Sequence, residues 1–356
     1  MLNGNSLAQI GKQQFSGLLR YMAMLALALL VFALVLLIFG KNPAQAYADI
    51  FSSTIGSAYG LSEVLVKVIP LVLCALAVLL PARIGLVNVG GEGQLYMGAL
   101  LATWGALAVG DSLPAVIGIP LMIILGFVGG GLWAAIPAFL RAKGWLNETI
   151  STLLLNYVAV LWVNFFVFGP FKDPESANFP QSVLFADSVR LPFIGSSRVH
   201  FGLVLGLIAL VVLYFVLKKT RWGYEMRAIG GNPEAARRHG LPITRYILVT
   251  MFIAGGLAGL AGMGEVMAIQ GRLRPGFSPG YGYMGFLISW LALHNPLGVV
   301  VMSFLIAIIA LGGDTLQITQ GMPFSSVNVL MSLILFIVLG KFFNNMSFGW
   351  PKWEAK

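Results

Sequence analysis

A short run of polar side chains interrupts the apolar sequence between Arg83 and Gln94 (ARIGLVNVGGEGQ). Asn88, Glu92 and Gln94 could hydrogen-bond a polar solute, and the glycines around them would break or bend a helix. Polar groups in apolar surroundings are costly, so they usually line a path or pair with one another. The stretch therefore predicts contact with a solute, or alternatively a surface hinge in which Arg83 is the partner of Glu92.

Aromatic and amide side chains also occur together in other apolar runs. Asn156 and Tyr157 are adjacent in LLLNYVA, and Trp290 lies close to Asn295. A ring beside an amide suits a flat polar ligand, but it suits packing equally well, because a lone intramembrane Asn commonly hydrogen-bonds a neighbouring helix. The candidate residues of a substrate path are Asn88, Glu92, Gln94, Asn156, Tyr157 and Trp290.

No motif for catalysis accompanies these residues. The sequence lacks a G-x-x-x-x-G-K-[ST] phosphate loop, and three scattered histidines with the lone Cys74 suggest no metal site. GFSPG at 276–280 matches G-x-S-x-G, but a nucleophile elbow needs a helix directly after the Ser, where Pro279 and Gly280 stand. We expect an external loop there, and we expect no enzymatic activity, no cofactor and no metal site.

The composition is that of a membrane protein. Of the 356 residues, 58% are hydrophobic and only 10% are charged, whereas a soluble domain carries roughly a quarter charged residues. Runs of about 20 apolar residues, each long enough to cross a bilayer as a helix, recur along the chain. We expect an all-α membrane protein with a single transmembrane domain over 1–356. The expected spans, about ten, are 21–39, 62–80, 93–109, 113–140, 147–168, 201–217, 246–270, 281–294, 297–313 and 327–343.

Basic residues set the expected orientation, because Lys and Arg accumulate in cytoplasmic loops. With the N-terminus inside, fifteen of them fall on the cytoplasmic side and six outside. Both termini and the loop 218–245 are then cytoplasmic, and the segment 169–200 is external, where we expect it to cover the external mouth. This asymmetry also explains most of the net charge of +9, and no nucleic-acid motif competes with it.

Two related segments indicate an internal repeat. YMGALLATWGAL begins at Tyr96, and YMGFLISWLAL begins at Tyr283, about half the chain further on. They lie in the third and eighth expected spans, so they should run in opposite directions. Inverted repeats are typical of transporters, in which the substrate path lies between the two halves. Coincidence between two aromatic-rich apolar segments is the alternative.

The cytoplasmic loop specifies a short helix, NPEAARRHG. Asn232 can cap its start, and Gly240 can adopt the left-handed conformation that ends it. A helix of about two turns is not stable alone, so we expect it to dock on a soluble partner. The alternative is a helix that lies on anionic lipid headgroups. The residues expected to couple to the partner are Pro233, Glu234, Ala235, Ala236, Arg237, Arg238 and Gly240.

The same stretch resembles a known motif. EAARRHG, in which Glu-Ala-Ala is followed after three residues by Gly, is similar to the coupling loop of ABC importer permeases, whose short helix sits in a groove of the ATPase. Residues 223–262 resemble the permease family for branched-chain amino acids, ribose and nucleosides. ARIGLVNVGGEGQLYMGAL and LNETISTLLLNYVA resemble its nucleoside-type branch more closely. The resemblance covers about 61–340, most of the chain.

This resemblance implies the inverted-repeat fold of an ABC importer permease in a bacterial inner or plasma membrane. The chain would form the path for a small polar solute, most of all nucleosides, with branched-chain amino acids or sugars as alternatives. The implied partners are a second homologous permease subunit, a cytoplasmic ATPase that hydrolyses the ATP, an external substrate-binding lipoprotein and membrane lipids. A stand-alone secondary transporter is the alternative class, although it would more often carry ionisable residues deep in its spans.

Overall fold

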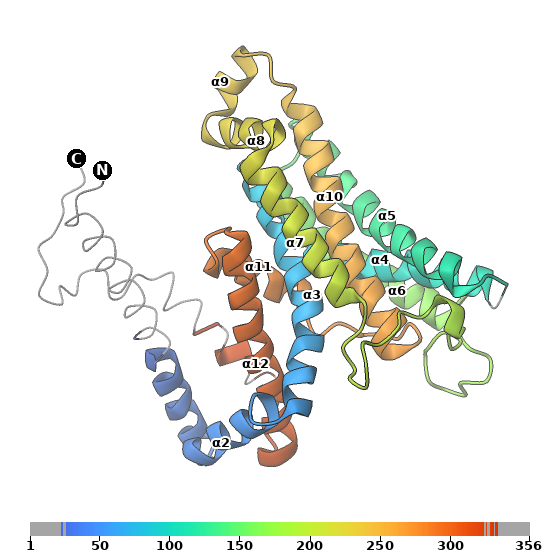
Figure 1. Cartoon of the computed structure of the whole chain (residues 1–356), viewed down its shortest axis with the longest axis vertical. Coiled ribbons are helices and arrows are strands. Elements are labelled where there is room, and N and C mark those ends of the chain that lie inside the picture. The colour runs from blue at the N-terminus through green and yellow to red at the C-terminus, as the bar shows by residue number, and fades with distance from the viewer. Residues whose placement is uncertain are drawn as a thin grey trace, which may run out of the picture. The chain divides into compact units, whose positions relative to one another are not determined.

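Helices are the regular elements of the part of the chain that the structure describes (Figure 1). The computed structural model describes residues 23, 26–110, 112–323, 325, 328–330 and 332–333. The chain divides into two compact units, one of Ser57–Ala307 and one of Met1–Gly56 with Ile308–Lys356. The all-α membrane class expected from composition is confirmed, and the single domain over 1–356 stays a prediction.

Capping side chains explain where several helices of the larger unit begin. Ser57, Asn147 and Thr220 each accept a backbone N–H from the first turn of the helix that follows, which satisfies a group with no partner inside that helix. The helices are α3 (Ala58–Ala82), α4 (Gly91–Val109), α5 (Ala115–Ala142), α6 (Glu148–Phe168), η1 (Asp187–Val189), α7 (Gly202–Lys219), α8 (Arg221–Gly231), α9 (Pro233–Arg238), α10 (Ile243–Gly264) with its π-helical extension η2 (Glu265–Gln270), α11 (Tyr281–Leu291) and the first part of α12 (Pro296–Gln320).

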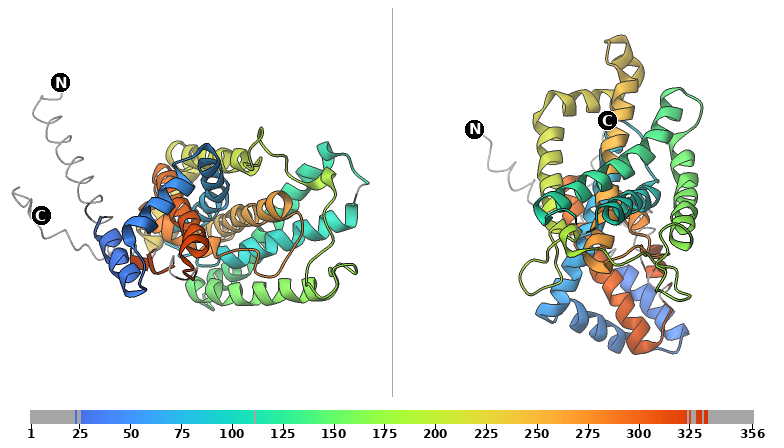
Figure 2. Two further views of the ribbon diagram at one scale, coloured as in Figure 1. Left: turned by 90° about the horizontal axis from the view of Figure 1, so that it is seen from below. Right: turned by 90° about the vertical axis from the view of Figure 1, so that its right-hand side faces the viewer.

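Helix α10 runs through the middle of this unit, among α3, α4 and α5 (Figure 1, Figure 2). Glycines make the close approach possible. A Cβ on Gly259 of α10 would overlap the carbonyl oxygen of Gly126 in α5, and a Cβ on Gly98 of α4 would overlap Gly259. Small residues thus bring three backbones into contact, which is how membrane helices gain packing energy where apolar burial supplies little driving force.

The smaller unit joins segments from both ends of the chain. A helix over Ala26–Ile38 and α2 (Pro43–Thr54) are bent by 117° at the break between them. The Tyr47 hydroxyl donates across this bend to a carbonyl of the first helix, over 2.6 Å. Ser53 of α2 in turn hydrogen-bonds to Thr315 near the end of α12, over 2.7 Å. Polar side-chain contacts therefore hold α2 between the helix over Ala26–Ile38 and the end of α12.

The expected number of ten spans is not confirmed. Six helices of the described residues are long and apolar enough to cross a membrane, or seven if the bent pair counts as one span. The expected span 281–294 is α11, whose 11 residues cover only about half of the hydrocarbon core. The expected span 93–109 is α4, which is not among the six and begins with the polar sequence GEGQ. Most of the last expected span, 327–343, lies outside the described residues.

The segment 169–200 is folded against the chain that follows α10. Ser182 and Leu273 exchange two hydrogen bonds of 2.9 Å, and the backbone N–H of Phe185 donates to the carbonyl of Gly271. Ser182 is fully buried as a result. The segment is therefore an ordered cover on one end of the larger unit, and the side of the membrane that it faces stays a prediction.

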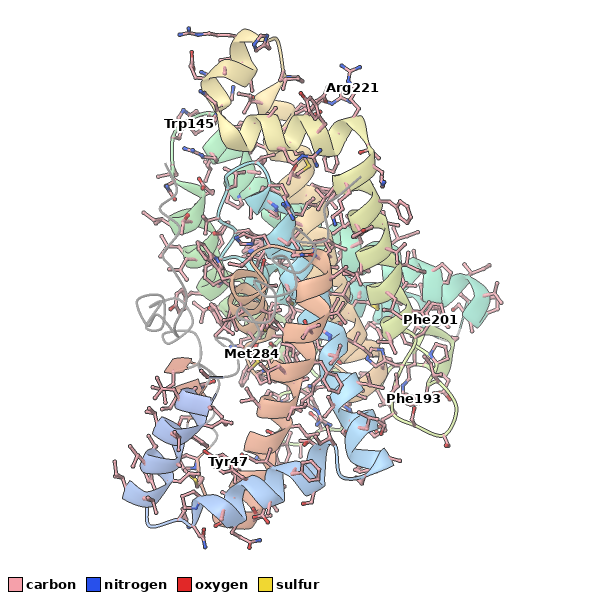
Figure 3. All side chains as sticks on the ribbon, turned by 60° about the vertical axis from the view of Figure 1, so that its left-hand side comes forward. Tyr47, Trp145, Phe193, Phe201, Arg221 and Met284 are labelled. Carbon is pink, nitrogen blue, oxygen red and sulfur yellow. The ribbon has the colours of Figure 1, made fainter. Side chains whose placement is uncertain are left out.

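Labelling can test the predicted orientation. Figure 3 shows Trp145 and Arg221 at one end of the larger unit, with Phe193 and Phe201 away from that end. In a Cys74→Ala background, we expect an impermeant thiol reagent to label Ser196→Cys, an exposed site in 169–200, in intact cells. Trp145→Cys should be labelled only after permeabilisation, because its turn lies at the end predicted to be cytoplasmic. The opposite order of labelling would mean that the chain is inverted.

Candidate functional site

Side-chain amides hold together the break before α4, which is the non-helical stretch 83–90 between α3 and α4. Asn88 and Gln94 are buried and form a reciprocal pair, with Nδ2 of Asn88 donating to Oε1 of Gln94 over 3.0 Å and Nε2 of Gln94 donating to Oδ1 of Asn88 over 2.9 Å. Asn88 also donates to the carbonyl of Ala77 in α3 and accepts the N–H of Gly90. The break leaves backbone groups without helical hydrogen-bond partners, and the side chain of Asn88 provides partners for two of them.

Asn156 joins α6 to the same break. Its Oδ1 accepts the N–H of Gly93 over 2.8 Å, and its Nδ2 donates to the carbonyl of Val89 over 2.9 Å. One turn earlier, the Thr152 hydroxyl accepts the N–H of Val89. A Cβ on Gly93 would lie only 2.9 Å from Oδ1 of Asn156, so glycine permits this approach. Side chains of α6 therefore replace the missing helical hydrogen bonds.

Glu148 at the start of α6 braces the break at a third point. Its Oε1 accepts the N–H of Val87 over 3.3 Å, and its Oε2 forms an ion pair with Arg141, 2.9 Å away. Glu148, Thr152 and Asn156 recur every four residues and so share one face of α6. The sequence interpretation did not include Glu148 or Thr152 in the site, although this spacing was the signal that could have grouped them with Asn156.

Glu92 joins the N-termini of two helices. It lies in the first turn of α4, and its Oε2 accepts the backbone N–H of Gly282 at the start of α11, over 2.7 Å. The helix ends are so close that a Cβ on Gly282 would overlap the backbone of Glu92. The alternative that paired Glu92 with Arg83 is wrong, because Arg83 donates instead to the carbonyl of His294 over 2.5 Å.

Most of the predicted path residues gather at this break. They are Asn88, Glu92, Gln94, Asn156 and Tyr157. Of these, only Tyr157 is substantially exposed, at 62%. Trp290 lies instead toward the other end of α11, where its ring packs against that of His294 with centroids 5.3 Å apart. Tyr283, which the sequence interpretation did not name as a path residue, follows Gly282 and is 41% exposed. Contact of any of these residues with a solute stays a prediction.

The GFSPG segment shapes the start of α11. The Ser278 hydroxyl accepts the N–H groups of Gly280 and Tyr281, each over 3.2 Å. Gly280 has φ of +97°, in the left-handed region that glycine adopts without strain. The serine therefore orders the helix start that Glu92 contacts.

Helices α8 and α9 form an elbow between α7 and α10, at the end of the unit where Figure 3 places Arg221. The short helix expected after Asn232 is confirmed as a structural element. Oδ1 of Asn232 accepts the N–H of Ala235 over 3.0 Å, Pro233 is the first helical residue, and Gly240 beyond the helix has φ of +82°. The coupling role of this helix stays a prediction.

The two alanines of α9 face different surroundings. Ala236 is only 5% exposed and packs within the chain, whereas Ala235 is half-buried. Glu234, Arg237 and Arg238 are exposed, and both arginines lie within 3.6 Å of the glutamate. The surface of α9 that a partner could reach is therefore mainly its charged side, because the chain itself covers Ala236.

Helix α8 rests on the end of α3. A Cβ on Gly230 would overlap the carbonyl oxygen of Arg83, whereas a Cβ on Gly231 would have nothing within 4 Å. Burial and the nearby charge of Arg227 lower the pKa of Arg83. Its guanidinium donates a hydrogen bond to the carbonyl of His294, in the turn between α11 and α12. The elbow therefore touches the residue from which the chain enters the break.

The chain is an apolar helical membrane protein. It contains a polar break and carries a short elbow helix at one end, which is the architecture of a transport subunit. Residues 60–339 match the protein family described as the branched-chain amino acid transport system / permease component. The chain belongs to this family. It is a permease subunit of an ABC transporter, a membrane translocation component and not an enzyme.

Several similar proteins are ABC transporter permeases. A glucose permease of Haloferax volcanii is 38% identical, over 90% of this chain and 87% of its own length. A guanosine permease of Bacillus subtilis is 30% identical over 93% of this chain and 95% of its own, and a nucleoside permease of Lactococcus lactis is 30% identical over 87% of each. No solved structure matches the chain. The family inferred from sequence motifs is confirmed, in preference to a stand-alone secondary transporter.

Proposed function

We propose that this permease subunit forms the path of an importer for uncharged nucleosides, with its substrate passing the break before α4. A homologous permease subunit completes the path, a cytoplasmic ATPase docks on α9, and an external substrate-binding lipoprotein delivers the nucleoside. Both termini are cytoplasmic in this arrangement. The subunit architecture is that of ABC transporters, and the exposed charged side of α9 supports the position of the ATPase.

The position of Glu92 carries the proposal for an uncharged substrate. Helix N-termini bear partial positive charge, and in transporters with broken helices they bind anionic groups of the substrate. Here the N-termini of α4 and α11 adjoin, and the side chain of Glu92 already lies between them. A substrate with its own carboxylate, such as an amino acid, would compete with Glu92. This favours nucleosides or sugars over branched-chain amino acids.

Two candidate substrate classes remain on this basis. The relatives named for guanosine and for nucleosides support nucleosides, and the relative named for glucose supports a sugar as the second candidate. A nucleoside combines a sugar with a flat base. Tyr157 follows Asn156, which contacts the break, and its exposed ring would offer a surface for such a base, which favours nucleosides.

Competition for uptake tests this proposal. Cells that carry the complete importer and lack other nucleoside uptake should accumulate labelled guanosine, and excess unlabelled uridine should compete. Excess glucose or leucine should not compete. Labelled glucose uptake without any guanosine uptake would select the second candidate, and leucine uptake alone would contradict both.

We expect Glu92→Gln to lower nucleoside uptake by about tenfold, because a charge-assisted hydrogen bond between two helix ends is weakened. The amide keeps the shape of the side chain, so membrane insertion and assembly should remain intact. The matched control is Glu63→Gln, which removes an ion pair to Arg198 (3.0 Å) elsewhere on α3. Uptake and the yield of assembled complex are measured for both variants. Normal uptake by Glu92→Gln would remove Glu92 from the translocation path.

A further inference from the structure

We propose that the rings of Tyr157 and Tyr283 form the surface that the nucleobase contacts as the nucleoside passes the break before α4. This inference rests on the proposed function and adds the two side chains that would recognise the base. Tyr157 belongs to α6 and Tyr283 to α11, so the surface is assembled from segments that are far apart in the sequence.

The buried amides at the break are already occupied. Asn88, Gln94 and Asn156 are each at most 1% exposed. Their side-chain nitrogen and oxygen atoms hydrogen-bond to one another or to the backbone of the break. Contact with a solute would require breaking these bonds and leaving buried polar groups unpaired, which is costly. We therefore assign them to holding the break in place, and recognition falls to neighbouring side chains that are exposed.

Each of the two tyrosines is next in sequence to a residue that contacts the start of α4. Tyr157 follows Asn156, which binds α6 to the start of α4, and Tyr283 follows Gly282, which Glu92 binds to the same start. Both tyrosine side chains are exposed, whereas the amides at the break are buried. Hydrogen bonds to one helix end thus hold the chain next to both tyrosines.

Exposed tyrosine rings at such a position suit a nucleobase. An aromatic face stacks on any base with little dependence on its identity, and the hydroxyl can hydrogen-bond to the polar edge of the base. Such a surface would guide a base without holding it tightly, since it does not enclose the ligand. A sugar lacks the flat ring and would gain less from these rings.

A lipid-facing position is the competing explanation for Tyr157. Leu161 and Phe165 follow it at intervals of four residues on α6, and both are exposed. A tyrosine on a lipid-facing surface could be replaced by leucine without loss of transport, whereas a ring that stacks on a base could not. The substitutions below separate these two cases.

The test measures guanosine uptake by the complete importer. We expect Tyr157→Leu and Tyr283→Leu each to reduce the maximal rate about tenfold, and the corresponding Phe variants to stay close to wild type, because they keep the stacking ring. The control is Tyr59→Leu, which replaces a similarly exposed tyrosine at the start of α3. It should transport normally. The yield of assembled complex shows whether each variant folds.

The outcomes separate this inference from the proposed function. If the wild-type importer moves no nucleoside, the proposed function itself fails. If it moves guanosine and the Leu variants do so at the wild-type rate, the two tyrosines are not the recognition surface. Equal losses in the Phe and Leu variants would overturn stacking as the mode of contact.

Accessibility gives a readout that does not depend on transport rates. In the Cys74→Ala background, Tyr157→Cys and Tyr283→Cys should react with a hydrophilic thiol reagent, and saturating guanosine with the binding protein should slow the reaction severalfold. Val211→Cys, an exposed apolar position on α7, should not react if it faces lipid. Failure of both tyrosine positions to react would place them outside an aqueous path and overturn the inference.

Discussion

Gly230→Ala should leave ATP hydrolysis running while transport falls to background. The added methyl would overlap the carbonyl oxygen of Arg83, so α8 must move away from the end of α3. This contact is a direct link between the elbow, on which we place the ATPase, and the chain that enters the break. A displaced elbow would still bind the ATPase, but its movement would no longer reach the break. The measurement compares substrate-stimulated ATP hydrolysis with uptake in reconstituted vesicles.

The neighbouring glycine supplies a matched control. A Cβ on Gly231 would meet nothing within 4 Å, so Gly231→Ala makes the same chemical change in the same helix without the overlap. We expect it to keep both hydrolysis and uptake at wild-type levels. Equal transport by the two variants would show that the Gly230 contact does not transmit motion. Loss of the assembled complex in Gly230→Ala alone would show a structural role instead.

The double substitution Arg237→Glu with Arg238→Glu should prevent the ATPase from co-purifying with the permease. Both side chains are exposed, and their ion pairs with Glu234 are exposed as well, so these pairs contribute little to the fold. Reversing two charges against a complementary surface costs several kcal/mol, which is about a hundredfold or more in affinity. Ala236→Trp would be a poorer probe, because Ala236 is buried and a large ring would disturb the elbow itself.

Two other basic residues show whether position or overall charge matters. Lys218 and Lys219 stand in the last turn of α7, outside the short helix. The double substitution Lys218→Glu with Lys219→Glu should leave co-purification of the ATPase intact if the partner contacts α9. Equal loss in both double variants would favour general attraction of the loop to an acidic surface, such as lipid headgroups, and would contradict docking on α9.

The chain sequence by itself determined those features that depend on neighbouring residues. The elbow helix is an example, because its cap at Asn232, its first residue Pro233 and its left-handed Gly240 act within a few positions of one another. The family could likewise be inferred from contiguous motifs. The reciprocal pair of Asn88 and Gln94 also lies within one short stretch, although its geometry needed the structure.

Only the tertiary structure decided which partners these polar side chains contact. Glu92 contacts Gly282, and Asn156 contacts Gly93; no spacing rule links residues so distant in sequence. The sequence also did not predict the length of α11, because the apolar residues continue beyond the end of the helix. There the chain turns through Leu293 and His294, which both have positive φ. Helix ends and long-range hydrogen bonds depend on where the chain returns in space. Apolar composition indicates that a segment can lie in the membrane, but not how far it stays helical or what it contacts.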